Sequence, residues 1–113
     1  MEKILSELFD ILVEMEAIDP IVLDMSETPI PTEYFIIMTA NSDVHMKSLR
    51  ERLVRYIKRS ELPLIYYDKG EGHDWLLIDA GDIVIHIFSK KGREFYDLEG
   101  LWVDARRIDT VGR

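Results

Sequence analysis

The sequence predicts a single mixed α/β domain, with helices packed on a mixed sheet of roughly five strands. Amphipathic helical patterns and short apolar runs alternate along the chain, and no repeat or long linker divides it. The chain has 113 residues, of which 47% are hydrophobic, which is enough for one core. We therefore expect one domain over residues 1–102 and a frayed polar tail over residues 103–113.

The first half of the chain predicts a helix, two strands and a second helix. Residues 3–18 place apolar side chains on one helical face until Pro20 ends the pattern. Residues 21–25 are short and rich in branched side chains, as in a strand. Residues 33–40 form an unbroken apolar run, typical of a strand covered on both faces. Residues 43–60 follow three good N-cap types and predict the second helix.

The second half predicts three strands and a short helix. Residues 62–67 form a strand despite Pro63 near its start. Residues 75–79 and 82–89 form two further strands with a tight turn between them. Residues 90–101 form a short helix or a few helical turns. The helices are expected to cover the sheet that these strands complete.

The turn between the last two strands decides which of their side chains face each other. With the two-residue loop Ala80-Gly81, Asp79 lies opposite Asp82. The remaining facing pairs are then Leu77 with Val84, Trp75 with His86 and His73 with Phe88 on one side, and Ile78 with Ile83, Leu76 with Ile85 and Asp74 with Ile87 on the other. The first side mixes rings, charge and aliphatic groups, which is typical of a contact surface.

Two readings of this mixed side remain open. Opposed carboxylates on Asp79 and Asp82 repel each other, which a cationic group of a partner between them would offset. Alternatively, the two carboxylates bond turn amides, as aspartates often do. His86 is then a structural residue, and Trp75 and Phe88 are ordinary core.

Charge and composition restrict the class of partner. The chain has 14 Lys and Arg against 22 Asp and Glu, a net charge of −8, and no basic stripe stands out. A basic protein surface is therefore the expected partner, and no direct contact with nucleic acid is expected. Cysteine is absent, and we expect neither a signal peptide nor a membrane-spanning segment. We expect a cytoplasmic protein that does not associate with membranes.

The segment from Asp74 to Trp102, DWLLIDAGDIVIHIFSKKGREFYDLEGLW, resembles the signature of the ribosomal silencing factor family, also called Iojap. The matching positions are Trp75, Asp79, Gly81, Asp82, His86, Arg93, Glu94, Phe95, Tyr96, Asp97, Leu98, Glu99, Leu101 and Trp102. Residues 19–24, 33–37 and 41–43 resemble the family more loosely. The sequence departs from the family pattern at Ala80, where Tyr is common, at Ala40-Asn41, and at Gly92 and Gly100.

The resemblance implies a binding protein without catalytic residues, metal or cofactor. Members bind the large ribosomal subunit through its protein L-fourteen, block joining of the small subunit and repress translation. Organelle relatives act in assembly of the large subunit, members are often homodimers, and the fold has a nucleotidyltransferase-like topology. The expected partner-binding residues are Trp75, Asp79, Asp82, His86, Phe88, Glu94, Tyr96, Asp97, Glu99 and Trp102. We expect Arg93 to order nearby carboxylates, whereas Phe95 and Leu98 fit either contact or core.

Two other functions compete with this one. An active or degenerate metal-dependent nucleotidyltransferase-like enzyme would use Asp79, Asp82 and His86 around a divalent cation. However, Asp82 and His86 are four positions apart on one strand, or roughly 13 Å at 3.3 Å per residue. The sequence also offers no Gly-rich phosphate loop. An interaction module unrelated to ribosomes explains the composition equally well, and only the segment from Asp74 to Trp102 argues against it.

Overall fold

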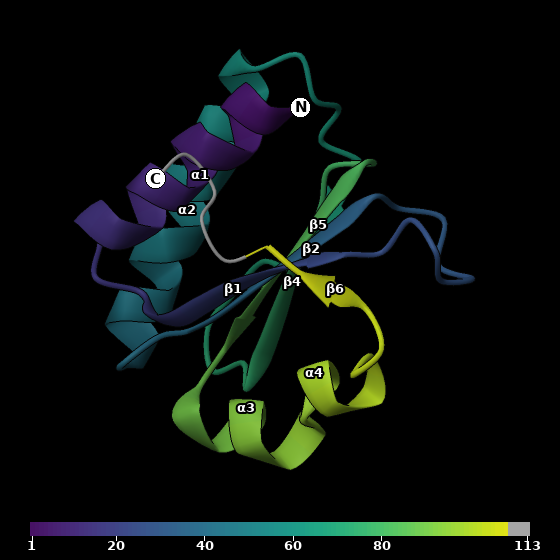
Figure 1. The fold of residues 1–113 in the computed structure, drawn as a ribbon. Helices are drawn as coiled ribbons and strands as arrows, with labels where there is room; N and C mark the ends of the chain where they lie inside the picture. The colour runs from purple at the N-terminus through teal and green to yellow at the C-terminus, as the bar shows by residue number, and fades with distance from the viewer. Residues whose placement is uncertain (109–113) are drawn as a thin grey trace.

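The computed structural model describes residues 1–108 and confirms a single mixed α/β domain (Figure 1). The elements are α1 (Glu2–Glu14), β1 (Ile18–Asp24), β2 (Tyr34–Thr39), α2 (Asp43–Arg59), β3 (Tyr66–Tyr67), β4 (Trp75–Asp79), β5 (Ile83–Phe88), α3 (Lys90–Tyr96), α4 (Leu98–Leu101) and β6 (Arg106–Arg107). Within the described residues the sheet has six strands in the order β3-β4-β5-β2-β1-β6. Strands β2 and β5 are parallel and all other neighbours are antiparallel.

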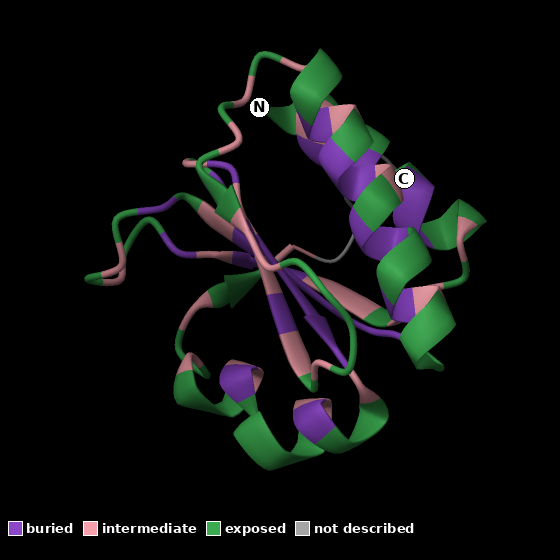
Figure 2. Cartoon of the chain, turned by 180° about the vertical axis from the view of Figure 1, so that it is seen from behind, coloured by how far each residue is buried: buried purple, intermediate pink, exposed green. Residues whose placement is uncertain are grey.

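Helices cover both faces of the sheet and create two cores. Helices α1 and α2 lie side by side on one face, and α3 and α4 lie on the other (Figure 1). The larger core, between α1, α2 and the sheet, contains aliphatic side chains such as Leu8, Leu53 and Ile85. The smaller core, beneath α3 and α4, contains aromatic side chains as well. Figure 2 shows how buried and exposed positions alternate along α1 and α2, as amphipathic helices require.

The first helix ends earlier than the apolar pattern suggests, and β1 begins earlier. Helix α1 stops at Glu14, and Glu16 and Asp19 then adopt positive φ angles of 58° and 45°. Strand β1 starts at Ile18 and includes Pro20, where the pairing with β2 is irregular between Ile18 and Ile21. A proline without an amide donor is tolerated at such a bulge.

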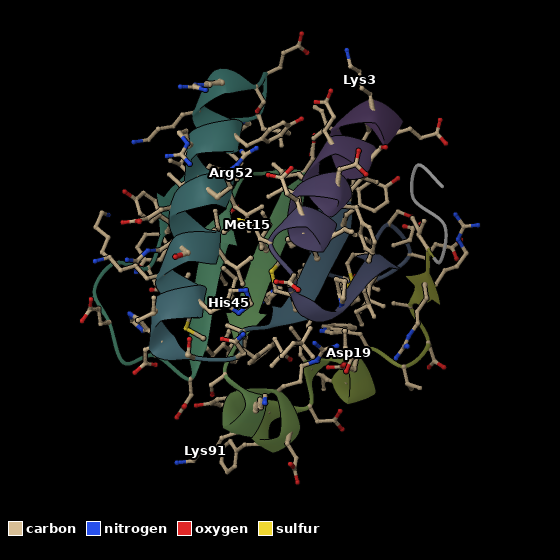
Figure 3. All side chains as sticks on the ribbon, turned by 90° about the vertical axis from the view of Figure 1, so that its left-hand side faces the viewer. Lys3, Met15, Asp19, His45, Arg52 and Lys91 are labelled. Carbon is tan, nitrogen blue, oxygen red and sulfur yellow. The ribbon has the colours of Figure 1, made fainter. Side chains whose placement is uncertain are left out.

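His45 ties the two long helices together near this point. Its Nδ1 accepts a hydrogen bond from the Asn41 amide at 2.9 Å, so Nε2 carries the proton and donates to the Met15 carbonyl at 2.8 Å. The bond joins the C-terminal end of α1 to the first turn of α2, and Figure 3 shows the two side chains at that end of the helical layer. No helix within residues 1–108 combines the length and apolar character needed to cross a bilayer.

Both edges of the sheet differ from expectation. Strand β3 contains only Tyr66 and Tyr67, because the chain from residue 62 onward contacts β4 at isolated points such as the bond from the Ile65 amide to the Asp79 carbonyl. At the other edge, residues 103–108 are not frayed. Arg106–Arg107 pairs with β1, and the Ile108 amide donates to the Val22 carbonyl at 2.9 Å. The rest of the expected tail, residues 109–113, lies outside the described residues.

Candidate functional site

A cluster of rings fills the face of the sheet beneath α3. Trp75 lies with its ring centroid 5.2 Å from that of Phe88 and 4.9 Å from that of Tyr96. Phe35 meets His86 edge-on at 4.4 Å, and His86 stacks with Phe88 at 6.5 Å. These separations are those at which aromatic pairs attract one another. The cluster holds α3 against β4 and β5.

His86 is an internal part of this cluster. Its side chain is only 3% exposed, and its Nδ1 accepts a hydrogen bond of 3.0 Å from Trp75 Nε1. The ring is therefore neutral, with its proton on Nε2, which has no hydrogen-bond partner among the described residues. Burial lowers the pKa of His86 to about 4, since the charged form would lose its hydration.

The hairpin register differs from the expected one: each residue of β4 pairs with the β5 residue two positions further along the chain than expected. Trp75 pairs with Phe88, Leu77 with His86, and Asp79 with Val84. The loop is Gly81-Asp82, because the Ala80 amide bonds the Ile83 carbonyl at 2.9 Å. Gly81 has a φ of 79°, the sign that type II′ turns need at their first loop position. A two-position change keeps every side chain on its predicted face, so only the partners were wrong.

The predicted opposition of Asp79 and Asp82 is therefore wrong. Asp79 Oδ1 accepts a hydrogen bond of 2.9 Å from the Gly81 amide, which confirms the reading that it bonds a turn amide. Asp82 lies exposed in the turn, and its carbonyl accepts bonds from the amides of Glu33 and Tyr34. The turn is at the opposite end of β4 from Trp75, so these two carboxylates do not join the rings in one patch.

The same geometry bears on the metal-dependent alternative. Asp79, Asp82 and His86 do not converge, since His86 is buried and bonded to Trp75 while Asp82 sits in the turn. Within residues 1–108, no group of three or more His, Asp or Glu side chains is placed to hold a metal ion.

Arg93 fastens the short helices to the sheet. Its Nε donates to Glu99 Oε2 at 2.8 Å, its Nη1 to Thr39 Oγ1 at 3.0 Å, and its Nη2 to the Asp19 carbonyl at 3.0 Å. Nη2 also lies 2.8 Å from Glu99 Oε2 in an ion pair. One guanidinium thus joins α4, β2 and β1, and its fork geometry allows all these bonds at once. The expectation that Arg93 orders a carboxylate is confirmed.

The carboxylate of Glu99 is consequently bound by Arg93 within the protein. Burial acts to raise the pKa of its carboxyl, but the hydrogen bond and charge of Arg93 outweigh burial, so the pKa lies below its ordinary value. Its other oxygen, Oε1, is buried and has no hydrogen-bond partner among the described residues. A carboxylate held in this way orients α4 and is a poor first contact for a partner.

The outer surface of α3 and α4 is apolar and acidic at once. Phe95 is 77% exposed, Leu101 71% and Tyr96 46%. The exposed carboxylates are those of Glu94, on α3, and Asp97, between α3 and α4. We call this surface, made by Glu94, Phe95, Tyr96, Asp97, Leu101 and Val103, the α3–α4 face.

Apart from Asp79, Asp82 and Glu99, described above, the expected contact residues divide into three groups. Glu94, Tyr96 and Asp97 are exposed on the α3–α4 face, while Trp75 and Trp102 are half-buried beneath it. His86 and Phe88 are buried, so the expectation that they present themselves at a surface is wrong. The sequence pattern indicated that the side of the hairpin with His86 and Phe88 is exposed, whereas α3 and α4 cover that side. Phe95 lies at the surface and Leu98 in the core, and Leu101, which is exposed, was not among the expected contact residues.

Comparison with known proteins gives one consistent result. The family model described as "Ribosomal silencing factor during starvation" matches residues 1–112. "Ribosomal silencing factor RsfS" of Bacillus subtilis is 37% identical over 100 residues, covering 85% of this chain and 81% of that protein. "Protein Iojap, chloroplastic" of Zea mays is 31% identical over 96 residues, covering 85% of this chain and 42% of that protein.

Two further relatives extend the comparison. "Mitochondrial assembly of ribosomal large subunit protein 1" of Mus musculus is 38% identical over 74 residues, covering 63% of this chain and 32% of that protein. A crystal structure of a Chromobacterium violaceum protein superposes with a TM-score of 0.82 and 27% identity, covering 91% of this chain and 87% of that one. The chain thus shares its fold with a solved structure over most of its length.

Proposed function

The chain belongs to the ribosomal silencing factor family, and we propose that it binds the large ribosomal subunit through ribosomal protein L-fourteen and blocks joining of the small subunit. Translation falls as a result, and no chemical step is required. Blocking by occupancy is an equilibrium effect set by affinity and concentration. The expected place of action is the cytoplasm.

The observation that carries this proposal is the α3–α4 face. Three apolar side chains, Phe95, Tyr96 and Leu101, stand in solvent on helices only seven and four residues long. Side chains of this size cost free energy when left in water, and they supply most of the affinity when a partner covers them. Glu94 and Asp97 beside them favour a basic partner over an acidic one.

The rigidity beneath this face supports the same proposal. The aromatic cluster and the Arg93 bonds fix α3 and α4 before a partner arrives. Binding then orders few new groups, so less of the interaction free energy is lost to conformational entropy. Trp75 and Trp102, half-buried, act from below by supporting Tyr96 and α4.

Steric blocking needs bulk as well as affinity. The domain measures 33 × 32 × 27 Å, and α1 and α2 lie on the opposite side of the sheet from the α3–α4 face (Figure 1). A protein docked through α3 and α4 therefore projects a whole helical layer away from its docking surface. That layer would occupy space that the small subunit needs.

The test combines subunit binding with subunit joining. Purified protein is titrated onto isolated large subunits, and joining is followed by light scattering after small subunits are added. We expect the protein to co-sediment with large subunits and to reduce joining in proportion to occupancy. Phe95→Ala should weaken binding by at least about tenfold, as for a central interface side chain.

Tyr66→Ala provides the matched control. Tyr66 is also an exposed aromatic residue but lies at the β3 edge, away from the α3–α4 face. This control should bind and block like the unmodified protein. Association with small subunits only, or equal losses in the two variants, would contradict the proposal.

A further inference from the structure

Helix α2 concentrates positive charge in an otherwise acidic chain. It contains six Lys and Arg residues and two carboxylates, a net +4, whereas the whole chain carries −8. The cations are Lys47, Arg50, Arg52, Arg55, Lys58 and Arg59. The expectation that no basic stripe exists is therefore wrong. The net charge concealed this stripe because the acidic residues lie elsewhere.

Five of these cations, all except Lys47, line two grooves. One groove, of about 470 Å³, runs between α2 and β3 and is lined by Arg55, Lys58 and Arg59 together with Lys69. The other, of about 510 Å³, lies beside α1 and is lined by Lys3 and Arg52 and again by Arg55 and Arg59. Arg55 and Arg59 thus form a ridge between the two grooves. We call Arg52, Arg55, Lys58, Arg59 and Lys69 the cationic track.

Most cations of the track form no ion pair with a carboxylate of the protein within residues 1–108. Within residues 1–108, no carboxylate lies within ion-pair distance of Arg52, Arg55, Lys58 or Arg59. By contrast, Lys47 pairs with Glu71 at 3.5 Å. Glu51 lines the first groove and Glu7 and Glu61 line the second, so the repulsion between these four cations is compensated only in part. A bound anion would relieve the repulsion that remains.

Internal hydrogen bonds fix the wall of the groove between α2 and β3 that faces α2. Arg50 is buried, and its Nη1 donates to the carbonyls of Gly70 at 2.7 Å and Asp68 at 3.3 Å. These bonds fix the loop that carries Lys69, whose ammonium lies 4.4 Å from the Tyr67 ring centroid. Lys69 is thereby held across the groove from Arg55 and Lys58.

The spacing suits a chain of anions better than a single one. Arg52, Arg55 and Arg59 are three and four positions apart, so they lie on one helical face with about 5 Å between successive turns. Charges on a nucleic-acid backbone also repeat every few ångströms. The Tyr67 ring, covered by Lys69, is not presented for stacking with a base. This combination favours phosphate contacts and disfavours base reading.

From this arrangement we propose that the cationic track binds the phosphate backbone of RNA without base specificity. The proposal goes beyond the one made for the α3–α4 face, since the two surfaces lie on opposite sides of the sheet (Figure 1). One protein molecule can therefore hold a basic protein on one side and RNA on the other. Figure 3 shows Arg52 in the helical layer and Lys91 at the distant end, on α3.

The test uses the full chain and a fluorescein-labelled mixed-sequence RNA of about 20 nucleotides, followed by fluorescence anisotropy. We expect a Kd in the range of about 1 to 100 μM at about 50 mM salt, weakening steeply as salt rises. The double variant Arg55→Gln with Arg59→Gln should lose roughly tenfold in affinity. It should also lower the slope of log K against log salt by about 1.4, or 0.7 for each phosphate contact on a single strand.

The matched control removes the same charge elsewhere. Lys90→Gln with Lys91→Gln, on exposed positions of α3, should leave RNA affinity within about twofold and the salt slope unchanged. Phe95→Ala, which tests the α3–α4 face, should also leave RNA binding unchanged, so failures of the two proposals are distinguishable. Absence of RNA binding at low salt, or equal losses in both double variants, would overturn the inference. Displacement of RNA by polyglutamate at lower concentrations than by unlabelled RNA would instead assign the track to an acidic protein.

Discussion

Gly92 of α3 packs directly against the backbone carbonyl of Asp74, leaving no room for a β carbon. The surrounding bonds fix this approach, because the Ser89 amide donates to the same carbonyl at 3.0 Å and Ser89 Oγ donates to Asp74 Oδ1 at 2.9 Å. Ser89 Oγ also accepts from the Gly92 amide at 2.9 Å and caps α3. A glycine that seems a poor helix former is thus what allows the helix to dock.

Gly92→Ala should therefore destabilise the protein. The added methyl group overlaps backbone, which cannot rotate away, and overpacking of this kind costs about 1 to 3 kcal/mol. Urea unfolding followed by circular dichroism measures the loss. Gly100→Ala is the control, because its methyl group would meet the movable carboxylate of Asp97. We expect little loss there, and equal losses at the two positions would refute this account.

Stability should fall as the pH drops below the ordinary pKa of histidine. The pKa of His86 is lowered to about 4 in the folded protein, so between pH 6.5 and 4 the unfolded chain binds the extra proton. The stabilisation is complete above pH 6.5 and is lost as the pH falls toward 4. Between pH 7 and 5 the expected loss is about 2 kcal/mol.

His86→Gln isolates this contribution, since glutamine retains an acceptor for Trp75 Nε1 and does not titrate. The difference in unfolding free energy between the protein and this variant should shrink as pH falls from 7 to 5. Contributions of groups that the substitution leaves unchanged cancel in that difference. A difference independent of pH would show that His86 titrates normally.

Removing Arg93 should loosen α4 more than removing its partner does. Arg93→Ala leaves the Glu99 carboxylate partly buried without a counter-charge, and breaking such a pair costs roughly 3 kcal/mol. Glu99→Gln keeps an acceptor for the guanidinium and leaves no uncompensated anion, so its loss should be about 1 kcal/mol. Thermal unfolding of the two variants at neutral pH gives the comparison. A larger loss in Glu99→Gln would contradict the role assigned to Arg93.

Charge reversal should distinguish the two acidic positions expected to meet a basic partner. Glu94 lies on the α3–α4 face, whereas Asp82 lies at the far end of the hairpin. We expect Glu94→Lys to slow association with large subunits several-fold at low salt, and Asp82→Lys to slow it less. Stopped-flow association at two salt concentrations measures both. A larger effect at Asp82 would move the contact surface toward the hairpin turn.

The sequence predicts the order of elements well, because periodicity reports which side chains are buried. The helix expected over residues 43–60 is observed as Asp43–Arg59, and the strand expected over 33–40 as Tyr34–Thr39. The hairpin faces were also predicted correctly, even though the turn is shifted, because strand alternation survives a two-position change in register. These features depend on local pattern alone.

The features that the sequence did not predict depend on contacts between distant segments. The burial of His86 depends on α3 and α4 folding over its face of the sheet. The break between α3 and α4 occurs at Asp97, whose φ of 43° interrupts what reads as one helix. The pairing of Arg106–Arg107 with β1 adds a strand to a segment that seems too polar for one. Family resemblance located the relevant segment without revealing which of its side chains reach solvent.

The brevity of β3 and β6 limits how this protein can associate with itself. Within residues 1–108 each outer strand has two residues, so another chain that pairs with β3 or β6 finds only a short backbone ladder. For copies that meet at high concentration, we therefore expect contacts through side chains of the helical layers. Assemblies held by such contacts dissociate on dilution, whereas fibrils grow by adding strands to an open sheet edge.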